Sequence, residues 1–538
     1  MAANSIFLCL QFLCLAFTII PTSAQDLGTW ETLVGNAGIS SMHTAVTPYN
    51  TVILLDRTDI GASELQLPDE GRGLATDSSA HSALLDLQNN AVFPLTIQTD
   101  TWCSSGQFLP DGTLLLSGGR NDGNTKFRAF TPGIKPSSYD WVELQNISLS
   151  QGRCSVEYYP PRPDGAVNFP FLGNVADNEG DNLYPYVHLL PNGNLFIYAN
   201  NKYVLYDYVN NVTITDLPQL EGGPRNYPSA GSSVMLALEG DYSTAEIVIC
   251  GGSQYNAYLN QTIYEPAQGT CGRIVATDPN PAWEMETMPH VLNTAEMVTL
   301  PTGDVLIING TDPSSNLVLY QPAESEGSRF TILNPTTIPR MYHSTANLLP
   351  DGRILLAGSN KRIEAFSPDY LSANNSNLRP VVVKAPNTVQ YGKLYNVYVT
   401  VPSPLTETVE VNFASTPYST HSFSQGQRLV KLVVTSVVPN VNGQNMIVCK
   451  APPNGLVAPP GNFREAPIAV HFVKLREKTH QILICHQDPE GLQRLPRLKE
   501  REQDRFHKTR GRGDRTEDFA KRRSRVDSEG GQGAIEVE

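Results

Sequence analysis

The sequence predicts an all-β protein, and two features of the chain indicate this class. Only 17% of its residues are charged, against about 25% in typical domains, while Gly and Pro number 41 and 40. One short motif also recurs along roughly the first two thirds of the chain: two residues, Pro, a polar residue and Gly, followed by an apolar run. Few charges, many turn residues and repeated apolar runs favour short strands joined by tight turns over long exposed helices.

Each copy of the motif is typical of a hairpin. Pro presets the backbone for a turn, Gly accepts the left-handed conformation, and the apolar runs on both sides suit strands that are buried on both faces. The four clear copies and one degenerate copy span residues 108–119, 189–198, 299–310, 348–358 and 232–252.

The spacing of these hairpins predicts a kelch-type β-propeller over residues 25–368. The turn prolines are Pro110, Pro191, Pro301 and Pro350, so the last interval is 49 residues, close to the roughly 50 of a kelch blade. The interval of 110 residues contains the degenerate copy and corresponds to two blades, whereas the interval of 81 is too long for one blade and short for two. The alternative is an irregular pair of β-sandwiches.

A different pattern begins after the last repeat. Residues 394–401, 409–413 and 428–435 alternate apolar and polar positions, which predicts a small immunoglobulin-like β-sandwich over residues 376–473. The 65 residues from 474 to 538 contain 29 charged side chains and cannot bury enough apolar surface to repay ordering, so we expect a disordered tail there.

Several features indicate secretion. Residues 6–20 are mostly apolar and small residues lead to Ala24, as in a signal peptide over residues 1–24; this run is too short to span a membrane. Cys250 and Cys271 flank one loop and could form a disulfide in an oxidising compartment. Glycosylation sequons, typical of secreted glycoproteins, stand at Asn146, Asn211, Asn260, Asn309 and Asn374.

The net charge of -14 gives the chain no electrostatic reason to bind nucleic acid or an anionic membrane. We expect no nucleic-acid or membrane partner, and separately we expect a monomer.

The repeat also aligns residues that can do chemistry. Seven residues before each turn proline stand Cys103, Tyr184, Thr294 and His343, and Tyr342 precedes His343. Equivalent strand starts crowd one end of a propeller channel, so a thiol, a phenol and an imidazole could meet there, and copper binds such side chains. The alternative for each residue by itself is a structural role: an inert buried Cys, or a hydrogen-bonded Tyr–His pair.

Three segments resemble the signatures of a known family. Residues 101–106 (Thr-Trp-Cys-Ser-Ser-Gly), 340–345 (Arg-Met-Tyr-His-Ser-Thr) and 420–428 (Thr-His-Ser-Phe-Ser-Gln-Gly-Gln-Arg) resemble segments of the copper-radical oxidases, in particular the plant glyoxal oxidase and galactose oxidase-like (aldehyde oxidase) group. The resemblance covers most of residues 26–461. It implies a propeller followed by an early-set immunoglobulin-like sandwich, in an extracellular enzyme of the apoplast or cell wall.

The resemblance also implies a site and a reaction. Tyr342 would be the axial phenol ligand of one copper ion per chain, His343 and His421 its imidazole ligands, and Cys103 the thiol that forms a thioether with a radical tyrosine. Such enzymes oxidise small aldehydes or primary alcohols with O₂ and release H₂O₂, because copper and the tyrosine each carry one electron.

The chain departs from the family after Arg153. Relatives continue there with a Trp-Tyr step and a further Pro-Asp-Gly hairpin, whereas here residues 154–160 follow directly, which also accounts for the short interval of 81 residues. The tyrosine expected to couple with Cys103 is therefore absent. Tyr184 is the best surrogate, and Tyr158 and Tyr159 are weaker ones. We expect an open gap that keeps Tyr184 away from Cys103, no thioether, and impaired oxidase activity.

The sandwich departs too, because the sequence from Asn462 onward does not resemble the family's closing strand. Two alternatives to an active oxidase stay open. One is a non-catalytic secreted propeller that binds cell-wall glycan or protein, and the other is a relative that binds copper but lacks the radical.

Overall fold

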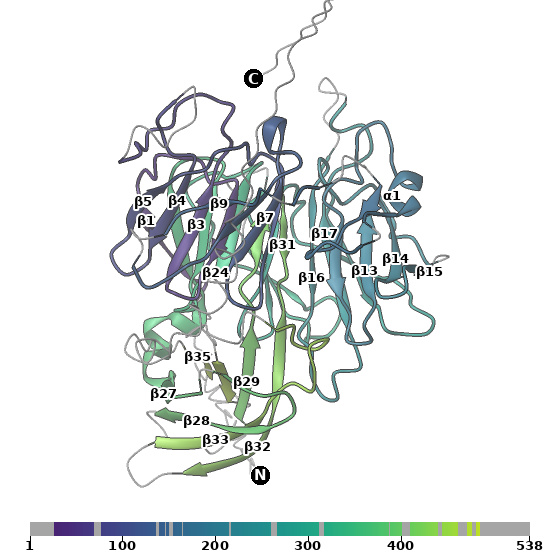
Figure 1. Cartoon of the computed structure of the whole chain (residues 1–538). Helices are drawn as coiled ribbons and strands as arrows, with labels where there is room; N and C mark the ends of the chain where they lie inside the picture. Colours follow the sequence, from purple (N-terminus) through teal and green to yellow (C-terminus); the bar gives the residue numbers. More distant parts are fainter. Residues whose placement is uncertain are drawn as a thin grey trace, which may run out of the picture. The chain divides into compact units, whose positions relative to one another are not determined.

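A computed structural model shows that the chain is built almost entirely of strands (Figure 1). It describes residues 26–68, 77–135, 139–145, 147–149, 154–163, 165–214, 217–259, 266–310, 317–386, 388–400, 409–439, 444–460, 471–475 and 480–484. Residues 1–487 form one compact unit and residues 488–538 another, and all described residues belong to the first. The predicted signal peptide and most of the predicted tail lie outside the described residues.

The propeller contains six antiparallel blades within the described residues, each with four strands of the propeller's own chain segment. The first blade is β2 (His43–Val46), β3 (Thr51–Leu55), β4 (Ser82–Asp86) and β5 (Ala91–Leu95), and the second is β6 (Ser104–Phe108), β7 (Leu114–Gly118), β8 (Phe127–Phe130) and β9 (Val142–Glu143). The third is β12 (Tyr186–Leu189), β13 (Leu195–Ala199), β14 (Lys202–Asp207) and β15 (Val212–Ile214), and the fourth is β16 (Gly231–Met235), β17 (Glu246–Gly251), β18 (Thr270–Val275) and β19 (Glu284–Thr287). The fifth is β20 (Glu296–Thr299), β21 (Val305–Ile308), β22 (Val318–Tyr320) and β23 (Phe330–Ile332).

The sixth blade joins the two ends of the propeller. It contains β24 (Ser344–Leu348), β25 (Ile354–Gly358) and β26 (Ile363–Ser367), and the N-terminal strand β1 (Thr29–Val34) pairs antiparallel with β26. The predicted all-β propeller is confirmed.

Between the second and third blades stands a sheet of only two strands, β10 (Ser155–Val156) and β11 (Val167–Asn168), followed by helix α1 (Pro170–Asn174). This short sheet follows Arg153, the position at which the resemblance predicts a missing hairpin. The remaining short helical turns of the described residues are η2 (Asn121–Gly123), η4 (Asp369–Leu371) and η5 (Ala373–Leu378).

The second domain is one curled sheet of seven strands. Its order is β27 (Val381–Lys384), β28 (Leu394–Thr400), β33 (Gln444–Lys450), β32 (Leu429–Pro439), β29 (Val409–Ala414), β34 (His471–Leu475) and β35 (His480–Ile484). Strand β32 pairs with β29 through its first residues and with β33 through its last, so it belongs to both halves of the sheet. Of the tail predicted to be disordered from residue 474, Lys474 and Leu475 belong to β34 and residues 480–484 form β35, where the apolar run 482–484 suits a strand; the rest of that tail lies outside the described residues.

One hairpin of the second domain enters the propeller. Strands β30 (Tyr418–Thr420) and β31 (Phe423–Gln425) pair with each other, and β30 pairs with β2, which extends the first blade to six strands. The hairpin touches the inner strand of every blade: β2, β6, β12, β16, β20 and β24. It therefore fills the central channel.

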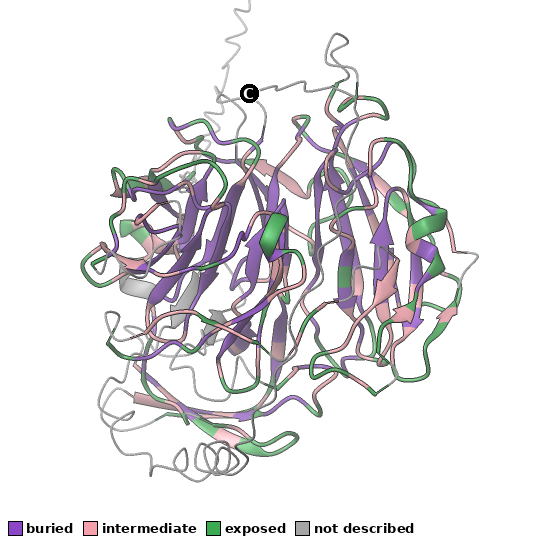
Figure 2. Cartoon of the chain, turned by 45° about the horizontal axis from the view of Figure 1, so that its top comes forward, coloured by how far each residue is buried: buried purple, intermediate pink, exposed green. Residues whose placement is uncertain are grey.

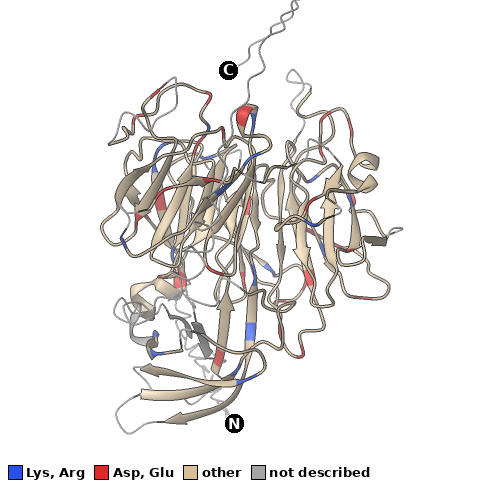
Figure 3. Cartoon of the chain, viewed as in Figure 1, with Lys and Arg blue, Asp and Glu red and all other residues tan. Residues whose placement is uncertain are grey.

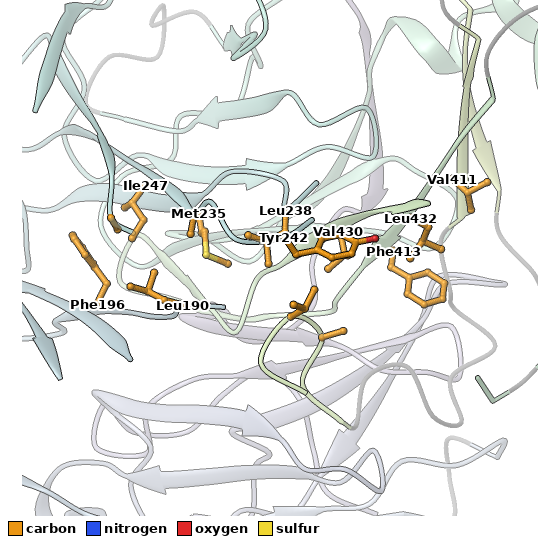
Figure 4. Close-up of a cluster of buried hydrophobic side chains, with 14 of the residues drawn as sticks. Leu190, Phe196, Met235, Leu238, Tyr242, Ile247, Val411, Phe413, Val430 and Leu432 are labelled. Carbon is orange, nitrogen blue, oxygen red and sulfur yellow. The ribbon is translucent and has the colours of Figure 1, made fainter. Parts of the chain in front are cut away.

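A shared apolar core fixes the hairpin's two ends. Ile247, Met235 and Leu190 of the propeller continue into Val430 and Phe413 of the second domain in one buried cluster (Figure 4). At this boundary the backbone NH of Leu238 donates to the carbonyl of Leu429 at 2.9 Å. Burial of this continuous apolar surface holds the two domains together.

The blade strands are largely buried and most exposed residues lie in loops (Figure 2), while acidic and basic residues are interspersed along the ribbon (Figure 3).

Cys250 and Cys271 stand opposite each other on β17 and β18 and form a disulfide. Among the described residues, no helix is long and apolar enough to cross a membrane.

Candidate copper centre

Four residues at equivalent strand starts share an unusual backbone conformation. Cys103, Tyr184, Thr294 and His343 have φ angles of 62°, 51°, 57° and 63°. Residues other than Gly seldom adopt this left-handed region, at a cost of about 1 kcal/mol each. The alignment on the turn proline therefore corresponds to a real structural equivalence, and it marks one end of the channel.

His421 reaches the same end from the second domain. It forms, with Ser422, the two-residue turn between β30 and β31, and both residues have positive φ, 47° and 63°, as the tightest hairpin turns require. Asn and Gly are the usual residues in such turns, so His and Ser here carry a backbone cost. The turn places a buried imidazole at the tip of the hairpin.

The rings of these residues converge around His421. Its ring stacks on that of Tyr184, with 4.0 Å between centroids and 13° between planes, and its centroid lies 5.2 Å from that of His343. Tyr342 stacks on His343 at 3.6 Å. The structure thus brings together Tyr184, Tyr342, His343 and His421, whereas Thr294 contributes a buried hydroxyl without a hydrogen-bond partner among the described residues.

Cys103 completes the cluster. Its Sγ lies 3.8 Å from Nε2 of His421. Burial raises the pKa of the Cys103 thiol to about 11, although the neighbouring Tyr184 opposes this shift, so the sulfur is protonated near neutral pH. The hydroxyl of Tyr184 donates its hydrogen to the backbone carbonyl of Ser104 at 3.1 Å.

The contact between Tyr184 and Cys103 corrects the expectation that an open gap would keep them apart. Both residues precede inner strands, β12 and β6, with the same left-handed backbone. Both residues line the cavity at this gap, and Tyr184 lies close enough to the Cys103 thiol to influence its pKa. Tyr158 and Tyr159 do not join the cluster: the Tyr158 hydroxyl donates to the Tyr208 carbonyl at 2.8 Å, and Tyr159 packs against Phe127.

Sequence reasoning missed two residues of the centre. Tyr227 hydrogen-bonds through its hydroxyl to that of Tyr342 at 2.9 Å and sets its ring edge-on to His421, with 5.1 Å between centroids. His43, fully buried at the start of β2, lies 5.8 Å from His421 between centroids. Neither residue stands seven positions before a turn proline. Tyr227 lies in residues 225–233, a further segment that resembles the copper-radical oxidases.

The electrostatic surroundings keep the imidazoles neutral. Burial lowers the pKa of His343 to about 4, with a smaller contribution from the positive charge of Arg57, and burial lowers the pKa of His421 well below its ordinary value. Arg57 and Arg120 lie over the ring of Trp102, with 3.5 and 4.2 Å from guanidinium carbon to ring centroid. Neutral imidazole is the form that binds metal ions.

The donor atoms fit a copper ion. Nε2 of His343 is buried and lacks a hydrogen-bond partner among the described residues, and Nε2 of His421 faces the weak thiol donor of Cys103 at 3.8 Å. No three His, Cys, Asp or Glu side chains in the described part converge tightly enough to hold a metal by themselves, so a metal here would need the Tyr342 phenol too. Imidazole and phenolate are ligands that suit copper.

The gap between the second and third blades is a cavity of about 930 Å³. It extends from Cys103 and Tyr184 along β6 and β12. Leu183, just before β12, is 50% exposed, and Val187, on β12, is 39% exposed. One end of the cavity therefore adjoins the centre, and its walls include the exposed apolar side chains Leu183 and Val187.

Comparisons with known proteins agree with this geometry. The family model described as "Glyoxal oxidase N-terminus" matches residues 42–155 and 150–370, and the model "Galactose oxidase-like, Early set domain" matches residues 379–464. The two segments of the first match overlap at residues 150–155, where the sequence predicts a missing hairpin.

Relatives match over most of the chain. It is 53% identical to aldehyde oxidase GLOX of Vitis pseudoreticulata over 81% of this chain and 94% of that protein, and 34% identical to aldehyde oxidase GLOX1 of Arabidopsis thaliana over 81% and 82%. A solved fungal alcohol oxidase of the AA5 family, in complex with copper, shares the fold with a TM-score of 0.55 at 16% identity, covering 86% of this chain and 99% of that one. The chain belongs to the glyoxal oxidase family of copper-radical oxidases.

Proposed function

We propose that this chain is a secreted copper oxidase that oxidises small aldehydes or primary alcohols with O₂ and releases H₂O₂. The observation that carries the proposal is the convergence of His343 and Tyr342 from the propeller with His421 from the second domain. The relatives named aldehyde oxidases support the substrate class. The comparisons give the non-catalytic alternative no support.

Three residues would hold one copper ion per chain: Tyr342, His343 and His421. Each histidine would bind through Nε2, because Nδ1 of His421 is already hydrogen-bonded to Thr420 at 2.6 Å and Nε2 of His343 lacks a partner. Bound copper supplies one-electron redox chemistry. Tyr342 is 39% exposed, so a small substrate can approach the centre from solvent.

The other residues of the cluster orient these ligands. Tyr227 holds the hydroxyl of Tyr342 at 2.9 Å, and Tyr184 covers one face of His421. Burial raises the pKa of the Tyr342 phenol above its ordinary value, and the nearby Tyr227 adds to this shift. A positive ion at the centre would oppose that shift and favour the phenolate.

Cys103 and Tyr184 are the pair that could supply a thioether here. Coupling would break the S–H bond and one ring C–H bond, form a C–S bond and pass two electrons and two protons to O₂, giving H₂O₂. The hydroxyl of Tyr184, which a radical tyrosine would present to the copper, is already bound to the Ser104 carbonyl at 3.1 Å. We therefore propose slow oxidation in this chain, with Tyr184 a poor substitute for the absent tyrosine.

Secretion and glycosylation belong to the same proposal. An extracellular site, in the apoplast or cell wall, fits the predicted signal peptide and the Cys250–Cys271 disulfide. Of the sequons, Asn374 is exposed and Asn309 has a buried amide, so Asn374 is the better acceptor.

H₂O₂ release by the copper-loaded, secreted protein tests the proposed function. We expect slow release with small aldehydes, no release from His343→Ala, and wild-type release from the control His290→Ala, whose histidine lies outside the cluster. Mass spectrometry should recover the Cys103 and Tyr184 peptides mostly unlinked.

Two results would contradict this proposal. Absence of H₂O₂ with every aldehyde and primary alcohol, despite bound copper, would make the chain a copper-binding relative without oxidase activity. A linked peptide two hydrogens lighter than its parts, together with fast release, would show that Tyr184 replaces the missing tyrosine fully.

A further inference from the structure

A chain of short hydrogen bonds connects His421 to the propeller wall. Nδ1 of His421 lies 2.6 Å from Oγ1 of Thr420, and the same Oγ1 lies 2.5 Å from Nδ1 of His43. Nε2 of His43 in turn lies 3.0 Å from the backbone carbonyl of Thr101. His43 and Thr420 are partners in the β2–β30 ladder, so strand pairing fixes this geometry.

The chemistry of the two ends decides where the protons lie. The Thr101 carbonyl can only accept, so Nε2 of His43 carries the hydrogen and donates it. Nδ1 of a neutral His43 is then an acceptor and takes the hydroxyl hydrogen of Thr420. The Thr420 oxygen has only lone pairs left, so it accepts from Nδ1–H of His421.

This assignment requires a neutral His43, and its surroundings provide that. The side chain is 0% exposed, and such burial disfavours the charged imidazolium. The weaker contacts agree with the assignment: Oγ of Ser104 lies 3.4 Å from Nε2 of His43, and Oγ1 of Thr420 lies 3.4 Å from the Met42 carbonyl, both longer than the competing bonds.

The hydrogen bonds at the His421 end of the network follow the same order of donors and acceptors. A ring that carries its hydrogen on Nδ1 has a bare lone pair on Nε2. The Cys103 thiol, a weak donor, faces that nitrogen, with its Sγ 3.8 Å away. Donor faces acceptor along the whole path from the Thr101 carbonyl to the centre.

We propose that His43 and Thr420 are positioning residues that fix His421 as its Nδ1–H tautomer, so that the lone pair of Nε2 is presented to the metal. This inference rests on the proposed copper site for its purpose, but the tautomer itself is a property of the copper-free protein. Partners of this kind commonly contribute 10–100-fold to metal affinity.

The test combines a tautomer measurement with a metal titration. In copper-free protein labelled with ¹⁵N-histidine, the nitrogen shifts of His421, assigned by the signal lost in His421→Gln, should show hydrogen on Nδ1 and none on Nε2. Thr420→Val removes the hydroxyl while keeping the branched shape, and Thr420→Ser keeps the hydroxyl as the matched control. We expect the valine variant to lose the single-tautomer signature and to bind Cu²⁺ roughly 10–100-fold more weakly, and the serine variant to retain both.

Hydrogen on Nε2 of His421 in the copper-free wild type would overturn the inference, and this measurement does not depend on any variant folding. The inference also fails if Thr420→Val keeps the Nδ1–H signature and wild-type copper affinity. A copper site that failed altogether would instead appear as weak Cu²⁺ binding in the wild type with the tautomer unchanged, so the two failures are distinguishable.

Discussion

At the scale of single residues, the centre is built from positions that the rest of the fold must hold in place. Cys103, Tyr184, His343 and His421 all have left-handed backbones, each costing about 1 kcal/mol relative to an ordinary conformation. Such conformations persist only where surrounding structure over-determines them, and they concentrate at functional sites. Blade pairing and the buried hairpin provide that support.

Glu296 gives a prediction at the same scale. It begins β20, is 1% exposed, and accepts hydrogen bonds from the backbone NH of Ala346 at 2.5 Å and from Ser424 of the hairpin at 3.2 Å. Burial raises the pKa of its carboxyl to about 7. Between its ordinary pKa and pH 7 the folded protein keeps a proton that the unfolded chain releases, so this group's contribution to stability falls as pH rises through that window.

Glu296→Gln should remove this contribution. The difference in unfolding free energy between variant and wild type should move by about 3 kcal/mol in the variant's favour from pH 4.5 to pH 8. Urea unfolding at both pH values measures it, with Glu284→Gln, an exposed position on β19, as the control. A difference that stays constant with pH would show that Glu296 is ionised in the folded protein throughout.

At the scale of elements, the hairpin β30–β31 and the two-stranded sheet β10–β11 decide how the site works. The hairpin carries His421 into the channel and is held there by pairing with β2. The short sheet leaves a cavity of about 930 Å³ and exposed apolar side chains at Leu183 and Val187. This part of the propeller therefore leaves apolar side chains beside β12 uncovered.

Restoring a family-like hairpin between residues 153 and 154 should stabilise the protein. The added strands would cover the exposed apolar side chains beside β12, and a gain of a few kcal/mol corresponds to several degrees in melting temperature. Scanning calorimetry of this variant, compared with an insertion of equal length made of Gly and Ser, isolates the effect of strand pairing. Equal melting temperatures for the two insertions would mean that the chain closes the gap in another way.

At the scale of the whole molecule, the sequence predicted the architecture and much of the centre because both depend on a local repeat. The turn proline and glycine mark the inner hairpins, and the residue seven positions earlier is Cys103, Tyr184 or His343. The first blade escaped detection because Asn50, at φ 57°, stands where other copies have Gly. His43 stands five residues before Pro48, the equivalent turn proline, so the seven-residue register does not mark it either.

Other features depend on contacts between distant segments, which a local pattern does not encode. The pairing of β1 with β26 closes the propeller, and the approach of Tyr184 to Cys103 crosses a gap that seemed from the sequence to separate them. The position of His421 was expected from the family resemblance alone. Its turn geometry and its bonds to Thr420 and His43 required the structure.

The central claim is that two domains together form one copper site, and the copper content of the secreted protein tests it most directly. Metal analysis after loading and removal of free copper should give about one copper per chain for the wild type and for His290→Ala, and little for the double variant His343→Ala/His421→Ala. Full copper content in the double variant would contradict the account.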